Sequence, residues 1–228
     1  DVDFDSGNIT AETIEPLINK KTKAISVVHL GGWPANLIKI KDIAKIYNLK
    51  LIEDCSQAHG AKINGLNVGS IGDIGTWSFC QDKILSTGGE GGMITTSHEN
   101  IGTFISSWRD HGKDIKKMFT KNQSSAFRYI HDNLGLNYRM TEIQSKIGDM
   151  QLKKLSTWHK KRSFNANQIA NALKQCKNVR VPLPSPPFEH AWYKFYAYLI
   201  PDALAEGWDR ERILFEFNKE KTPVLFPK

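Results

Sequence analysis

The chain has 228 residues, of which 40% are hydrophobic and 24% are charged, so it can bury the core of one large domain or parts of two and is not a disordered protein. Its 31 Lys and Arg residues exceed its 24 Asp and Glu residues and give a net charge of +7, which suits an anionic cofactor or a nucleotide-linked substrate. The basic residues are scattered along the chain, so we expect no nucleic-acid partner.

The first half of the chain alternates strand and helix patterns. Residues 24–30 form a nearly continuous apolar run, which is typical of a strand covered on both faces. A glycine-rich turn follows, then a helical stripe over residues 38–47 and a second apolar strand that ends at Glu53-Asp54, which together predict a βαβ unit. The same reasoning predicts the elements that come next: a tight turn at Asn64-Gly65, strands over residues 74–79 and 93–96, and a helix over residues 100–109.

The second half begins with a loop and then becomes helical. Residues 113–132 are polar and without period, whereas the pattern from 141 to about 173 is helical. The core candidates of this helical stretch are Ile143, Ile147, Met150, Leu152 and Leu155. Prolines between residues 182 and 187 break the chain, and they are followed by a β-prone aromatic segment over 192–200 and a short helix over 210–217. We place a domain boundary near residue 155, which separates residues 1–155 from residues 156–228.

Lys83 lies between Ser78 and the glycine-rich stretch at residues 88–92. A single lysine is a surface residue by default, but here the Ser78 hydroxyl can bind phosphate and the glycines let the backbone bend closely around a ligand. The spacing of these glycines differs from the dinucleotide fingerprint, and they precede a strand instead of a helix, so a Rossmann site is disfavoured. A lysine in this setting is a candidate nucleophile that forms a Schiff base.

Asp54 is the acid that such a lysine requires. An Asp after a strand often caps the next turn, but open α/β sheets bind ligands at the carboxyl ends of their strands, where Asp54 lies. A carboxylate there would keep the ring nitrogen of pyridoxal 5′-phosphate (PLP) protonated. Glu53 would point to the opposite face as a structural residue, whereas Gln57 could reach the same ligand as Asp54.

The remaining sequence signals concern compartment and covalent links. Cys55, Cys80 and Cys176 form no CxxC pair and no metal-ligand spacing, so we expect neither a disulfide framework nor a metal site, and we expect a reducing cytoplasm. No run approaches the roughly 20 apolar residues of a membrane span, and the first residues lack the pattern of a signal peptide. We therefore predict a cytoplasmic enzyme without a membrane partner.

The ordered set of motifs resembles the DegT/DnrJ/EryC1/StrS family of sugar aminotransferases. The segments that carry the resemblance are Ile52-Glu53-Asp54, Gln57-Ala58-His59-Gly60-Ala61, Gly69-Ser70-Ile71-Gly72-Asp73-Ile74-Gly75, Ser78-Phe79 with Lys83, Gly89-Glu90-Gly91-Gly92, Arg109-Asp110-His111-Gly112 and Gly135-Leu136-Asn137-Tyr138-Arg139-Met140-Thr141-Glu142. Each segment is modest alone, but the ordered set is highly specific and covers most of the chain.

The resemblance implies an α/β fold of the PLP-dependent transferase type I, with a mainly parallel sheet flanked by helices and a smaller C-terminal α+β domain. Residues 1–155 would then be part of the large PLP-binding domain and residues 156–228 part of the small one. The resemblance also implies that a segment carrying a phosphate turn and an aromatic residue that stacks on the cofactor precedes residue 1, and that more of the small domain follows residue 228.

The resemblance further implies the roles of six side chains. Lys83 would form the Schiff base with PLP, and Asp54 would bond the pyridinium nitrogen. Gln57 would approach the ring hydroxyl and Ser78 would hold the phosphate. The family builds its sites across a homodimer interface, so Asn137, or Arg139, would reach the phosphate bound by the neighbouring subunit.

The implied reaction moves an amino group from an amino acid, commonly glutamate, to a nucleotide-linked keto sugar, for amino sugars of lipopolysaccharide, capsule or other polysaccharides. Two alternatives stay open. Sugar dehydratases of the same family resemble this pattern with histidine in place of the lysine, which Lys83 argues against. The second alternative is a non-catalytic regulatory or binding protein that retains the fold.

Overall fold

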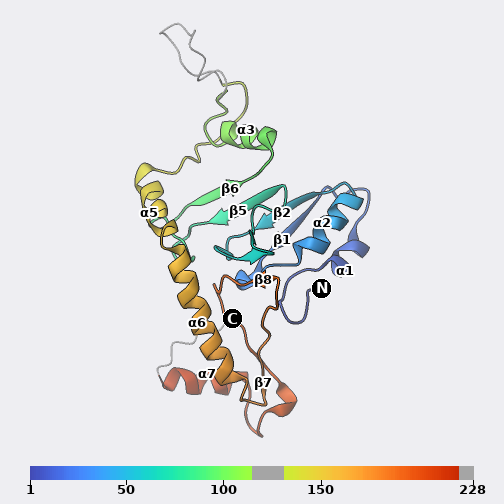
Figure 1. Ribbon diagram of the computed structural model, residues 1–228, viewed down its shortest axis with the longest axis vertical. Helices are drawn as coiled ribbons and strands as arrows, with labels where there is room; N and C mark the ends of the chain where they lie inside the picture. Colours follow the sequence, from blue (N-terminus) through green and yellow to red (C-terminus); the bar gives the residue numbers. More distant parts are fainter. Residues whose placement is uncertain (115–130, 221–228) are drawn as a thin grey trace.

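A computed structural model describes residues 1–114 and 131–220 (Figure 1). Its centre is a four-stranded sheet with the strand order β1-β2-β5-β6. The strands are β1 (Ala24–Val28), β2 (Lys50–Asp54), β5 (Ile74–Ser78) and β6 (Gly92–Thr95). The first three are parallel and β6 runs antiparallel to β5. Helix α2 (Leu37–Ile46) connects β1 to β2, which confirms the predicted βαβ unit and the mainly parallel sheet.

The core lies on one face of this sheet. Val27 and Leu51 point from β1 and β2 toward Leu37 and Ile40 of α2, and all four side chains are almost completely buried. Burial of each such side chain stabilises the fold by roughly 2 kcal/mol. The short helix α1 (Ala11–Ile14) contributes Ala11 to the same core, and Thr10 caps that helix.

The prediction that the first strand is covered on both faces is wrong for the described part of the chain. Strand β1 alternates between exposed and buried residues, and Val28 is 41% exposed. The reason is that Ile25 and Val27, on one face of β1, pack in the core with residues of α1 and α2, and helix α2 contacts the neighbouring strand β2. Asp54 pairs with Val28 across the two strands, so the carboxylate shares this more open face.

A second, antiparallel sheet joins residues from both halves of the chain. Strands β3 (Lys62–Ile63) and β4 (Leu66–Asn67) form a hairpin, and β8 (Phe188–Glu189) pairs with the other edge of β3. Asn64 and Gly65 both have positive φ angles, of 52° and 77°, as a two-residue hairpin turn requires, so the predicted turn is confirmed. The division into domains at residue 155 stays a prediction.

Four longer helices complete the described chain: α3 (Glu99–Trp108), α5 (Glu142–Leu152), α6 (Leu155–Leu173) and α7 (Arg210–Lys219). They confirm the three predicted helical stretches, with the middle one divided near residue 153. The β-prone stretch 192–200 contains only β9 (Tyr198–Leu199), which pairs with β7 (Val179–Arg180). Most of the predicted loop 113–132 lies outside the described residues. Within the described ranges, none of the helices is both long and apolar enough to cross a bilayer.

The predicted helical core residues are mostly at the surface. Ile143 is 75% exposed, Met150 is 51% exposed and Leu152 is 58% exposed, whereas Ile147 and Leu155 are half-buried. Helix α5 runs along the side of the molecule and continues into α6 as one long column (Figure 1). The helical period was therefore read correctly, but the face that carries these residues is not covered by the described part of the chain.

Candidate functional site

The ends of β2 and β5 place the principal polar side chains at one edge of the sheet. Asp54 is the last residue of β2 and Ser78 is the last residue of β5, and these two strands are parallel neighbours. The chain then turns, with the Lys83 amide donating to the Cys80 carbonyl oxygen at 3.0 Å. The carboxyl ends of the strands thus carry an acid, a hydroxyl and, five residues later, an amine.

Asp54 is half-buried and keeps part of its carboxylate available. Its Oδ1 accepts from the Ser56 amide at 3.0 Å, and this is the only hydrogen bond recorded for the Asp54 side chain among the described residues. The turn after β2 therefore uses one carboxylate oxygen, as a capping Asp does. The other carboxylate oxygen, Oδ2, can accept a hydrogen bond from a ligand.

Glu53 faces the opposite side and organises a loop. Its fully buried carboxylate accepts from the amides of Gly69, Ile71 and Gly72 at 2.6, 2.8 and 2.6 Å. Burial alone would raise the pKa of Glu53, but the hydrogen bonds from His29 and from the glycine amides outweigh it and lower the pKa. Glu53 is thus a structural anion, as the sequence predicts.

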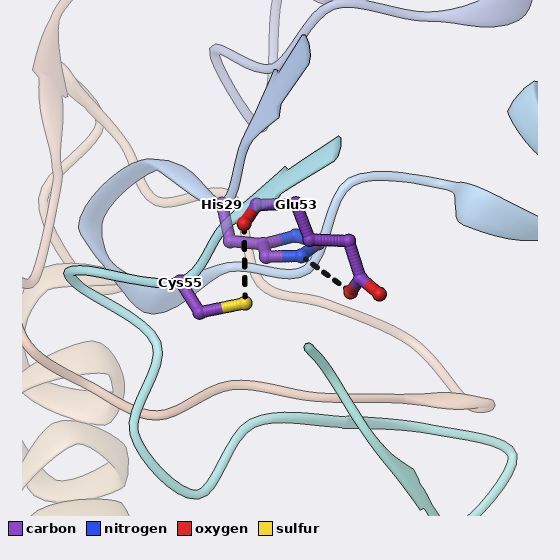
Figure 2. Close-up of side chains that lie close together, drawn as sticks. All are labelled: His29, Glu53 and Cys55. Carbon is purple, nitrogen blue, oxygen red and sulfur yellow. Dashed lines mark hydrogen bonds and ion pairs between the residues drawn. The ribbon is translucent and has the colours of Figure 1, made fainter. Parts of the chain in front are cut away.

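His29, Glu53 and Cys55 lie together in the core (Figure 2), close enough to suggest a metal site. The Ala35 amide donates to His29 Nδ1 at 3.0 Å, so the neutral ring carries its proton on Nε2 and donates it to Glu53 at 3.2 Å. Burial, followed by the nearby Glu53 charge, raises the pKa of the Cys55 thiol, which keeps it protonated. The three side chains bond to one another and to backbone groups, and we assign them a structural role in the core.

Lys83 meets two side chains, one of which comes from far along the sequence. Its Nζ donates to Asp82 Oδ1 at 3.1 Å and to Tyr193 Oη at 3.4 Å, and Tyr193 Oη donates to Asp82 Oδ2 at 2.6 Å. Burial lowers the pKa of Lys83, but the hydrogen bonds to Asp82 and Tyr193 outweigh it and leave the pKa raised. The hydrogen bonds from Tyr193 and Lys83 lower the pKa of Asp82 to about 2.

Tyr193 was missed by the sequence reasoning. The aromatic residues around it indicated only a β-prone segment, and nothing in their spacing points to a lysine 110 positions earlier. Backbone hydrogen bonds on both sides fix its position, because the Ala191 amide donates to the Gly32 carbonyl at 2.8 Å and the Lys194 amide to the Gly31 carbonyl at 2.9 Å.

Gln57 and Ser78 each accept one hydrogen bond from the backbone and keep a donor group for a ligand. Gln57 Oε1 accepts from the Gly31 amide at 2.7 Å, which leaves its NH₂ group as a donor. Ser78 Oγ accepts from the Cys80 amide at 3.3 Å, which leaves its hydroxyl hydrogen as a donor. Both side chains can therefore donate to anionic oxygens.

His59 lies behind this edge as a neutral ring. It is 2% exposed, and it packs against Trp77 and Phe79 with ring centroids 5.2 and 5.8 Å away. Burial is the main cause that lowers the pKa of His59 to about 4, and the nearby Lys83 charge contributes. His59 thus adds no positive charge to the site at neutral pH.

The glycine-rich stretch bends as expected. Gly88 has a φ of 83°, and a Cβ at Gly91 would come within 2.2 Å of the Thr87 hydroxyl oxygen. A side chain at Gly91 would therefore push Thr87 out of place. This stretch brings the chain back from Lys83 to β6 within a few residues.

Asn137 and Arg139 belong to a different group of residues. Asn137 pairs with Asp110 in a β-bridge, and Arg139 Nε donates to Asn137 Oδ1 at 3.2 Å and lies 3.4 Å from an Asp110 carboxylate oxygen. Both residues are exposed, and the described part of the chain records no contact between them and Lys83, Asp54 or Ser78. The structure thus gathers four of the six predicted site residues at or near the sheet edge and leaves these two apart.

Comparison with known proteins gives a consistent result. The sequence profile of the DegT/DnrJ/EryC1/StrS aminotransferase family matches residues 1–224. The chain is 36% identical over 197 residues to a UDP-N-acetyl-3-dehydro-alpha-D-glucosamine 3-aminotransferase of Acidithiobacillus ferrooxidans, which covers 86% of this chain and 49% of that protein. The chain spans about half the length of the curated relatives that it matches.

Two solved structures show the same fold. The X-ray structure of an aminotransferase from Psychrobacter cryohalolentis superposes with a TM-score of 0.95 at 43% identity, over 98% of this chain and 58% of that one. The E. coli GDP-4-keto-6-deoxy-D-mannose-3-dehydratase with bound hydrated PLP superposes with a TM-score of 0.83 at 26% identity, over 96% and 57% of the two chains. These likenesses confirm the predicted α/β transferase fold.

Proposed function

The chain belongs to the DegT/DnrJ/EryC1/StrS aminotransferase family, and from this premise we propose that the protein is a PLP-dependent nucleotide-sugar aminotransferase. The observation that carries the proposal is the position of Lys83, whose half-buried amine follows the adjacent ends of β2 and β5. The relative from Acidithiobacillus ferrooxidans acts, by its name, on a keto sugar linked to UDP. The solved E. coli dehydratase that shares the fold contains bound hydrated PLP.

The donors and acceptors at the sheet edge fit PLP. Asp54 offers a free carboxylate oxygen, which suits a pyridinium N–H. Ser78 and Gln57 offer an O–H and an NH₂, which suit a phosphate oxygen and a phenolate oxygen. Each of these side chains is thus the partner that one part of the cofactor requires. Its contacts within the protein leave that hydrogen-bonding group available.

Each side chain then has a stated task. PLP, when bound, supplies an aldehyde that condenses with an amine and a ring that withdraws electrons from the bond that breaks. Lys83 supplies the amine, and once released it carries a proton between carbon atoms of the donor and the cofactor. Asp54 keeps a negative charge beside the ring nitrogen, and Ser78 and Gln57 fix the orientation of the ring.

For the substrates, we infer an amino acid donor, with glutamate as the first candidate, and a nucleotide-linked keto sugar as acceptor. The net charge of +7 suits a ligand that carries phosphates. The product would be an amino sugar for lipopolysaccharide, capsule or another polysaccharide, made in the cytoplasm.

The purified protein tests this proposal directly. We expect added PLP to give a visible absorption band that borohydride removes, and mass spectrometry to locate the reduced cofactor on Lys83. A panel of nucleotide-linked sugars with the keto group at carbon 3 or carbon 4 should then yield an amino sugar with glutamate present. Cofactor binding with sugar deoxygenation and no amino transfer would identify a dehydratase instead. Absence of both the adduct and any turnover would favour a non-catalytic binding protein.

We also propose that the active unit is a homodimer with shared sites. Exposed apolar side chains lie close in sequence to the predicted phosphate contacts, since Leu134 is 92% exposed, Tyr138 is 65% exposed and Ile143 is 75% exposed. Monomeric proteins rarely expose large apolar patches, so a partner subunit is the natural cover for this surface. Asn137 and Arg139, which lie in the same segment, would then face the partner's cofactor.

Subunit mixing tests the shared site. A Lys83→Ala chain and a chain with Asn137→Ala and Arg139→Ala should both be inactive alone, whereas their hybrid dimers should regain one working site of two. We expect activity to appear on mixing, at no more than roughly half the wild-type value for each hybrid dimer. A mixture that stays inactive after subunit exchange is verified by mass spectrometry would contradict the contact across the interface.

A further inference from the structure

Lys83, Asp82 and Tyr193 close a ring of three hydrogen bonds. The Lys83 amine donates to both partners, and the Tyr193 hydroxyl donates its single hydrogen to Asp82. Two hydrogens of the Lys83 amine suffice for these contacts, but the Asp82 carboxylate oxygen lies 3.1 Å from Lys83 Nζ, and this negative charge favours the ammonium over the neutral amine. The ring of contacts therefore favours the protonated form of Lys83.

We propose that Asp82 and Tyr193 form a clasp that holds the protonated amine of Lys83 beside the sheet edge whenever that amine is not bonded to the cofactor. The proposal rests on the proposed function, because it concerns the resting state of the lysine that reacts there. Tyr193 is in this view a positioning residue, which acts through Lys83.

The position of Tyr193 is fixed by the fold. Its neighbours Ala191 and Lys194 bind the backbone of Gly32 and Gly31, and Gln57 binds the amide of Gly31. The same glycine turn thus anchors Gln57, which we assign to the cofactor, and the phenol that touches Lys83. A defined phenol position lets the freed amine return to one place instead of swinging into solvent.

Asp82 restrains the ammonium but does not remove its proton. Hydrogen bonds from Tyr193 and Lys83 lower the pKa of Asp82, so this carboxylate does not keep a proton, and the proton of Lys83 has to pass to solvent before the amine attacks an aldehyde. The clasp consequently slows the loading of the cofactor at neutral pH while it keeps the lysine in place.

Within residues 1–114 and 131–220, few charged and titratable groups lie around Lys83, and the Cys80 thiol, which also interacts with Glu90, is next to Asp82. Asp82 and Tyr193 contact its amine, His59 is neutral above a pKa of about 4, and Lys194 lies on the Tyr193 ring with its Nζ 5.0 Å from the ring centroid. Removal of the Asp82 charge removes the attraction that favours the ammonium, so the pKa of Lys83 should fall in Asp82→Asn. Tyr193→Phe removes a hydrogen-bond acceptor but no charge, and the fall should be smaller.

Competitive acetylation of the cofactor-free protein measures this effect. The extent of acetylation of Lys83 by acetic anhydride is followed against pH by peptide mass spectrometry, with the exposed Lys45 as internal reference. We expect the midpoint of the Lys83 profile to move to lower pH in Asp82→Asn and, less, in Tyr193→Phe, with several-fold more labelling at a fixed pH below the wild-type midpoint. Tyr196→Phe is the matched control, because its ring packs over Gly31 and no contact with Lys83 is recorded for it.

A change of exposure alone would alter the plateau of labelling without moving its midpoint. Unchanged midpoints in both variants, or an equal shift in Tyr196→Phe, would overturn the proposal. If Tyr193→Phe fails to fold, Asp82→Asn still decides, since the Asp82 side chain is 54% exposed and lies outside the core. Shifted midpoints without any PLP adduct would support the clasp and refute the proposed function. A PLP adduct on Lys83 with unchanged midpoints would support the proposed function and refute the clasp.

Discussion

Replacement of Lys83 with alanine or arginine should abolish amino transfer and leave the fold intact. Neither side chain can form and exchange a covalent bond with an aldehyde, and we expect turnover to fall below detection. The recorded partners of the lysine amine are Asp82 and Tyr193 near the surface, so no buried network collapses with it. The side chain is 17% exposed and each hydrogen bond contributes about 1 kcal/mol, so we expect only a small loss of stability.

The measurement pairs turnover with thermal unfolding. Lys45→Ala serves as the control, because Lys45 is an exposed lysine in the last turn of α2. Both variants should unfold near the wild-type temperature, and only the Lys83 variant should lose turnover. Substantial amino transfer by Lys83→Ala without an added primary amine would show that another group forms the covalent bond.

Asp54→Asn should retain the cofactor and lose turnover by orders of magnitude. The asparagine keeps the shape of the side chain, and its Oδ1 can still accept from the Ser56 amide, so the turn after β2 survives. The negative charge is lost, however, and with it the group that keeps the ring nitrogen protonated. Electron withdrawal therefore weakens more than binding does.

Cofactor titration and single-turnover kinetics separate the two effects, with Asp42→Asn on the exposed side of α2 as the control. Near-normal turnover in Asp54→Asn would mean that another acid partners the ring. Adjacent Glu53 is not that acid, because it lies on the buried face and its carboxylate accepts from four donors. Near-normal turnover would therefore contradict the proposed cofactor site, because Glu53 could not take over the role of Asp54.

Sequence patterns determined the local structure and the principal candidate residues. The βαβ unit, the turn at Asn64-Gly65 and the helices follow from periodicity and turn chemistry, which act over a few residues and need no knowledge of distant segments. Asp54 was likewise predicted to lie at the carboxyl end of a strand, where open sheets bind ligands, and Ser78 and Lys83 were selected as candidates from their spacing before the glycine-rich stretch. The family resemblance added roles that the residues alone do not specify.

Only the tertiary structure decided which distant segments meet. Tyr193 reaches Lys83 because β8 pairs with β3 and because the backbone around Tyr193 binds the Gly31-Gly32 turn. Glu53 holds a loop that begins 16 residues later, and α5 turns its apolar residues outward where the helical period indicated a core. Such contacts join residues far apart in the chain, and a period of two or of 3.6 shows which residues share a face but not what covers that face.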